Sequence, residues 1–69
     1  MKTEPNIPDA DGFYAALIAA HEGLSEAQSD ALMLRLTLIL ANQIGDQQVL
    51  LEAIAAARVM VAEDAGTPP

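Results

Sequence analysis

A single histidine is the residue in this chain best suited to move a proton. His21 stands seven residues after Tyr14 and three after Ile18, so the three share one side of a helix if the segment is helical. A histidine beside a tyrosine could transfer a proton or hydrogen-bond a ligand. His21 also precedes Glu22 and Gly23, where a histidine interacts favourably with the last carbonyl groups of a helix. We favour the second interpretation and keep Tyr14 and His21 as a candidate ligand site.

Other catalytic and metal-binding patterns are missing from the sequence. The chain has one histidine and no cysteine, so a metal site would need carboxylates from distant positions or from another chain. The acidic residues near the start lack the spacing of a calcium loop, and the four glycines stand too far apart to cradle a phosphate. Ser25 or Ser29 could be a nucleophile only with His21 as base, and Ser25 is better explained as a helix cap. We therefore predict a protein that is not an enzyme and holds no metal or cofactor.

Asn42 is a polar residue late in an otherwise apolar segment, shortly before Gly45 and Asp46. Its amide could fix the register of helix packing or satisfy the end of a helix, or it could bind the backbone of a partner. We favour the structural role. Asn42 joins Tyr14 and His21 as a candidate polar site.

The composition restricts the classes of function. The chain has 69 residues, enough for one domain, and 52% of them are hydrophobic although it contains one Phe, one Tyr and no Trp. Ten acidic residues against three basic ones give a net charge of −7. This charge argues against nucleic acid and anionic membranes as partners, because both attract clustered Lys and Arg. An acidic surface suits a basic protein partner as well as simple solubility.

No segment has the pattern of a secretion signal or of a membrane span. Glu4, Pro5 and Pro8 stand where a signal would be apolar. Arg35 and Thr37 interrupt the most apolar segment. We therefore expect a cytoplasmic protein.

Residues that begin and end helices divide the chain into three predicted helices. The first begins after Asp9 or Asp11, either of which can cap its first turn, and extends through residues 13–22 to Gly23. The second begins at Ser25, which with the three residues after it matches a capping box. The starts of these two helices are thus predicted from side chains that can hydrogen-bond to nearby backbone groups.

The second helix is predicted to extend to about Ile44, where Gly45 ends it, and Asp46 caps a third helix. Because short connections join antiparallel neighbours, we expect the two long helices to form a hairpin, with the first helix laid across it. The predicted ranges are a flexible arm at residues 1–8, one helical domain at 9–65 with its third helix at 47–64, and a flexible tail at 66–69.

The leucines from Leu32 to Leu40 alternate with other residues, which is the spacing of a strand. A strand here would have no partner, because the rest of the chain is rich in alanine and divided by helix-ending residues. An unpaired strand cannot satisfy its backbone. We therefore predict a helix over this segment.

As a helix, the second segment is apolar on two sides. The two sides are separated by Gln28, Arg35 and Asn42 along one border and by Asp30 and Thr37 along the other. We call them the wide face, made of Leu32, Met33, Leu36, Ile39, Leu40 and Ile44, and the narrow stripe, made of Ala27, Ala31, Leu34, Leu38 and Ala41.

One apolar side of this helix can pack against the other two helices. The remaining apolar side then indicates an interface with another chain. We expect an all-α protein, a short N-terminal helix plus an antiparallel helical hairpin, that dimerises into a helical bundle. A compact three-helix monomer and a complex with another protein are the alternatives. The predicted interface residues are Leu34, Leu36, Leu38, Ile39, Leu40, Ala41, Ile54 and Met60.

Three segments together resemble a family of small bacterial proteins that contain a domain of unknown function. The segments are 13–17 (FYAAL), 20–25 (AHEGLS) and 38–46 (LILANQIGD), and the likeness extends over about residues 9–60. The resemblance implies a bacterial, stand-alone helical protein without assigned catalytic residues. It also suggests an accessory role beside flavin-dependent aromatic hydroxylases and related catabolic enzymes, near whose genes such proteins can be encoded.

Two functions of different classes follow. The first is a non-enzymatic protein-interaction module that self-associates and docks on a partner. The second is a ligand-binding or accessory subunit of a catabolic, flavin-dependent enzyme, in which Tyr14 and His21 line a pocket. A third hypothesis, a regulator that neutralises a basic protein, rests on the acidic charge alone.

Overall fold

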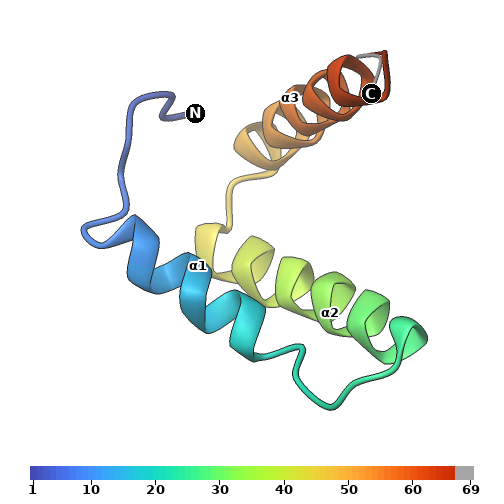
Figure 1. Ribbon diagram of the computed structural model, residues 1–69. Helices are drawn as coiled ribbons and strands as arrows, with labels where there is room; N and C mark the ends of the chain where they lie inside the picture. The colour runs from blue at the N-terminus through green and yellow to red at the C-terminus, as the bar shows by residue number, and fades with distance from the viewer. Residues whose placement is uncertain (67–69) are drawn as a thin grey trace. The chain divides into compact units, whose positions relative to one another are not determined.

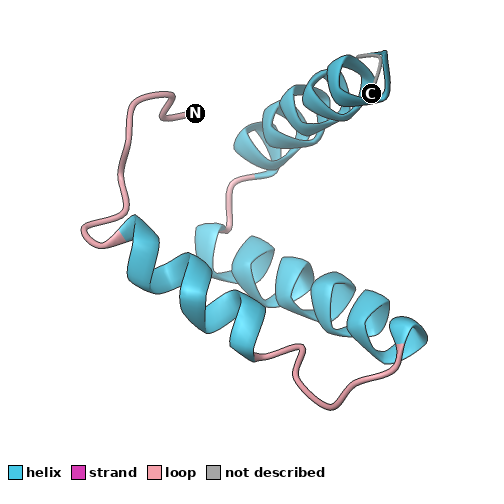
Figure 2. Cartoon of the chain, in the orientation of Figure 1, coloured by secondary structure: helices cyan, strands magenta, loops and turns pink. Residues whose placement is uncertain are grey.

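The computed structural model describes residues 1–66, and the side chains of residues 1–64. Three helices follow one another along the chain (Figure 1): α1 over Ala10–Ala19, α2 over Glu26–Ile44 and α3 over Gln47–Gly66. The other described residues form loops and turns, and no strand occurs among residues 1–66 (Figure 2). The all-α class with three helices is confirmed, and the segment with alternating leucines is part of α2.

Asp9 caps the start of α1. The backbone N–H of Gly12 donates a hydrogen bond to Oδ1 of Asp9 at 2.9 Å. Asp11 lies inside the first turn, where a negative charge interacts favourably with the N-terminal end of the helix dipole. Of the two caps that the sequence allowed, the structure therefore uses Asp9.

The end of α1 comes earlier than predicted. The helix stops at Ala19, and the N–H groups of His21 and Glu22 bond to carbonyls three residues back, at 3.1 Å each. This tighter turn replaces the regular helix that was predicted to reach residue 22. Gly23 does adopt the left-handed conformation, with φ of +76°, so the residue that reverses the chain was predicted correctly.

The predicted capping box at the start of α2 is confirmed. The N–H of Ser25 donates to Oε1 of Gln28 at 2.9 Å, and the N–H of Gln28 donates to Oγ of Ser25 at 3.1 Å. The helix ends at Ile44 as expected, because Gly45 takes a φ of +65°.

Asp46 caps α3 as predicted, since the N–H of Val49 donates to its Oδ1 at 3.2 Å. The helix includes Gly66, which the sequence had placed in the tail. Residues 67–69 of that predicted tail lie outside the described residues. The chain before Ala10 forms no helix or strand, and the flexibility of the arm at residues 1–8 stays a prediction.

The chain divides into two compact units. The first is Lys2–Leu40, which holds α1 and most of α2. The second comprises Met1 and the chain from Ala41 on, with the end of α2 and all of α3. The antiparallel pairing of α2 with α3 stays a prediction, because it concerns the placement of one unit against the other.

Neither unit has a core of its own. None of the described side chains is fully buried, and removing one unit can only increase the exposure of the other. The half-buried side chains of the first unit are Leu17, His21, Ser29, Ala31, Leu32 and Leu36, and those of the second are Ala41, Val49, Leu50, Ala53 and Ala56.

Candidate interaction surface

Two pairs of leucines, one on each apolar side of α2, differ in exposure. Leu32 and Leu36 of the wide face are half-buried. Leu34 and Leu38 of the narrow stripe are 63% and 61% exposed. Because a side chain and the residue four positions later share a face of a helix, these pairs report on two separate surfaces. The chain therefore covers part of the wide face and leaves the leucines of the narrow stripe open.

Most of the predicted interface residues are exposed apolar side chains. They come from α2, from its middle onward, and from α3, and their exposure makes them available to another chain. Leu34, Leu38, Ile39, Leu40, Ile54 and Met60 are exposed, whereas Leu36 and Ala41 are half-buried. Their contact with a second copy stays a prediction.

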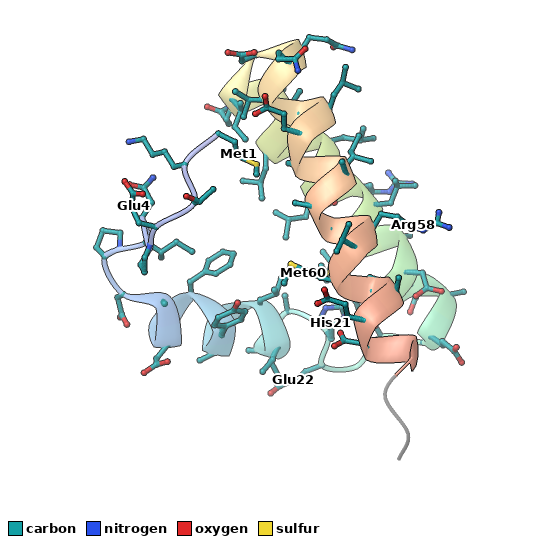
Figure 3. All side chains as sticks on the ribbon, turned by 90° about the horizontal axis from the view of Figure 1, so that it is seen from above. Met1, Glu4, His21, Glu22, Arg58 and Met60 are labelled. Atoms are coloured by element: carbon teal, nitrogen blue, oxygen red, sulfur yellow. The ribbon has the colours of Figure 1, made fainter. Side chains whose placement is uncertain are left out.

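Arg58 and Met60 lie on different sides of α3. Figure 3 shows Arg58 and Met60 pointing away from opposite sides of α3. Met60 is 64% exposed and Ile54 is 65% exposed. An exposed apolar surface therefore occurs on α3 as well as on α2, in a separate unit of the chain.

Thr37 borders the narrow stripe without needing an outside partner for its hydroxyl group. Its Oγ1 donates a hydrogen bond to the backbone carbonyl of Met33 at 2.8 Å. A hydroxyl satisfied inside its own helix costs less to cover with apolar atoms than an unpaired one. The sequence signal for this bond, a threonine four residues after a helical carbonyl, was not used in the sequence interpretation.

The charged residues that border the narrow stripe make no ion pairs in the described part of the chain. Asp30 lies on one border and Arg35 on the other, and the one ion pair found there joins two other groups. Both side chains are exposed. They are therefore available to groups on another molecule.

Tyr14 and His21 are not brought together by a hydrogen bond among residues 1–66. Tyr14 lies in the middle of α1 and is 59% exposed, with its ring centroid 6.1 Å from that of Phe13. His21 lies in the turn after α1, next to Glu22 (Figure 3), and is half-buried. Since α1 ends before His21, the helical spacing that predicted a shared side does not extend to this residue.

Asn42 lies in the last turn of α2, and its amide has no hydrogen-bond partner within the described chain. The end of the helix is satisfied by backbone instead, because the N–H of Gly45 donates to the carbonyl of Ala41 at 2.9 Å. The role of satisfying the helix end therefore does not fall to this amide. Its predicted roles in register or partner recognition remain predictions.

The described side chains include no group of three or more histidines and carboxylates close enough to hold a metal ion. Among the described helices, none combines the length and the apolar character needed to cross a bilayer. The exposed apolar side chains of α2 and α3 are therefore the candidate surface for binding another protein chain.

A protein-family model matches residues 1–59, which is most of the chain. The chain belongs to the DUF2783 family. DUF2783 is described as a protein of unknown function, so membership assigns no activity. The match confirms the resemblance to a functionally undefined family. No curated protein and no solved structure matches the chain significantly.

Proposed function

We propose that this DUF2783 protein is a non-enzymatic interaction module that self-associates through apolar surfaces of α2 and α3. The observation that carries the proposal is the lack of a buried side chain in either unit of the described chain. A chain of 69 residues without cysteine has no disulfide to replace a core. Association that buries its exposed apolar surface would therefore add the most to its stability.

A second copy is the partner that is present whenever the protein is present. Most symmetric assemblies are dimers in which the same patch of each chain faces the other. The leucines of the narrow stripe are apolar and exposed, as a self-complementary patch requires. Two copies of α2, with α3 from each, would form the bundle that the sequence predicts.

The acidic charge supports a further partner for the assembled module. Each chain has a net charge of −7, so a dimer would carry twice that charge on its outer surface. Such a surface attracts basic protein surfaces and repels nucleic acid. We propose a basic protein surface as the docking target, in a cytoplasmic setting. An accessory role beside a catabolic enzyme would be one use of this activity.

The test of self-association is the solution mass, measured by light scattering on a sizing column over a wide range of concentrations. The proposal predicts twice the 7.2 kDa chain mass at micromolar concentrations and above. A mass of one chain at every concentration would contradict it. The two units would then have to cover each other within one chain, or wait for a different protein.

A further inference from the structure

We propose that two copies dock α2 against α2 in parallel and in register along the narrow stripe, with Asp30 of each copy facing Arg35 of the other. This inference rests on the proposed self-association and adds the surface, the orientation and the charges that select it. It names a second copy of this chain as the occupant of the stripe.

The stripe has the spacing of a two-helix seam. Its members are separated alternately by four and three residues, which is the repeat that keeps one side of a helix against a partner helix. The seam is the narrow stripe itself, made of Ala27, Ala31, Leu34, Leu38 and Ala41. Two large side chains at the centre are thus flanked by small ones, which let two backbones approach closely.

The first unit does not cover the two leucines of this seam. Leu32 and Leu36, on the other side of α2, are half-buried. Leu34 keeps 63% of its surface exposed. A parallel pair in register would stack Leu34 on Leu34 and Leu38 on Leu38, and so cover both leucines of both copies in two adjacent layers.

The charges bordering the seam are complementary to themselves in a parallel pair. In such a pair, a residue on one border of the seam faces the residue five positions later on the opposite border of the partner helix. Asp30 and Arg35 stand five positions apart on opposite borders, and each lacks an ion pair in the described chain. The twofold symmetry then forms two identical ion pairs.

An antiparallel pair would place like borders against each other. The Arg35 side chains of the two copies would approach near the middle of α2, since Arg35 is central in Glu26–Ile44. Like charges that face each other across an interface disfavour that arrangement. The charge pattern therefore selects the parallel orientation.

Single-cysteine variants test the orientation, because the natural chain has no cysteine. Ala27→Cys and Ala41→Cys introduce thiols at the two ends of the seam, about 21 Å apart along the helix. In the parallel pair each thiol meets its own copy, so each variant alone should form a disulfide-linked dimer under mild oxidation. Gln43→Cys, on the opposite side of α2, is the matched control and should remain largely unlinked.

The outcomes separate this inference from the proposed function. A dimeric mass with no disulfide in either variant alone, but with a disulfide in their mixture, would overturn the parallel orientation and leave self-association standing. A monomeric mass for the unmodified protein would overturn both. Linked dimers of each variant, without linkage of the control, would support the parallel pair.

Charge exchange tests the ion pairs independently. Arg35→Glu or Asp30→Lys alone should raise the dimer Kd about tenfold, because each turns two attractions into two repulsions. The double variant Asp30→Lys with Arg35→Glu restores opposite charges and should return Kd to within about threefold of the natural value. Lys2→Glu makes the same change in net charge as Arg35→Glu, far from the seam, and should have little effect. A double variant as weak as the single ones would overturn the proposed pairing.

Discussion

On one side of α2 the leucines Leu32 and Leu36 are half-buried, and on the other side Leu34 and Leu38 remain open to solvent. The two sides belong to the same helix and carry the same type of residue. They differ in how much of each leucine is exposed. The local sequence can therefore specify a helix and still give it more apolar surface than the first unit covers.

The largest expected effect comes from a matched pair of substitutions, one on each apolar side of α2. Leu38→Glu should weaken the dimer by more than a hundredfold and leave the helix content of the chain nearly unchanged. Each dimer loses two leucines from its interface, and burial of each contributes about 1.5–3 kcal/mol. Sedimentation equilibrium measures the first effect and circular dichroism the second.

Leu36→Glu is the control for this experiment, because it places the same charge on the wide face. We expect it to reduce helix content and thermal stability, since Leu36 is half-buried. If Leu38→Glu were the variant that unfolds, Leu38 would be an ordinary core residue. The contrast between the two sides would then be lost.

A smaller effect is expected at the turn that connects α1 to α2. Gly23→Ala should lower the free energy of unfolding by about 1–2 kcal/mol, because φ at this position is +76° and an alanine is strained there. Apart from the two neighbouring residues, no atom lies within 4 Å of the added Cβ, so we expect backbone strain to be the main cost. Urea unfolding at several protein concentrations measures this cost and separates it from the contribution of association.

Gly45→Ala provides the comparison for this turn. Its φ of +65° predicts a similar strain, at the link between α2 and α3. If neither glycine variant changed the free energy of unfolding, the predicted strain of alanine at these two positions would be wrong.

The capping box at the start of α2 should contribute about 1 kcal/mol to stability. Ser25→Ala removes the oxygen that accepts the N–H of Gln28 at 3.1 Å and should lower the melting temperature by several degrees. Ser29→Ala is the matched control in the first turn and should have a smaller effect, since Ser29 makes no capping bond in the described chain. Equal effects of the two variants would contradict the assignment of the cap.

The smallest effect is expected at the histidine. His21→Gln should change stability by less than about 0.5 kcal/mol, since the side chain makes no hydrogen bond among the described residues. Pull-down of partners from the native cell should be unaffected. Loss of a partner or ligand in this variant would favour the accessory-subunit alternative with Tyr14 and His21 at its site.

The parts of the fold that could be predicted are those set by contacts within three or four residues. Ser25 with Gln28, Asp46 with Val49, and the left-handed glycines were readable from residue type and order. The end of α1 was missed because its last N–H groups bond three residues back instead of four, and nothing in the residue types near Ile18 signals that choice.

The candidate site was only partly readable for a different reason. The sequence showed that α2 has two apolar sides, but it did not show which of their leucines are half-buried in the folded chain. The side chains of Leu36 and Leu38 are alike as sequence, and their different exposure appears only in the folded unit. The proposed pairing of Asp30 with Arg35 likewise rests on the exposure of Leu34 and Leu38, which the sequence alone does not show.

The most direct test of the central claim is an isotope-filtered nuclear Overhauser experiment on a mixture of labelled and unlabelled chains. It detects contacts between protons of different copies and ignores those within one copy. The account predicts cross-peaks from the methyl groups of Leu34 and Leu38 to the same residues of the other copy. A sample of dimeric mass that gives no cross-peak between these methyl groups of different copies would contradict it.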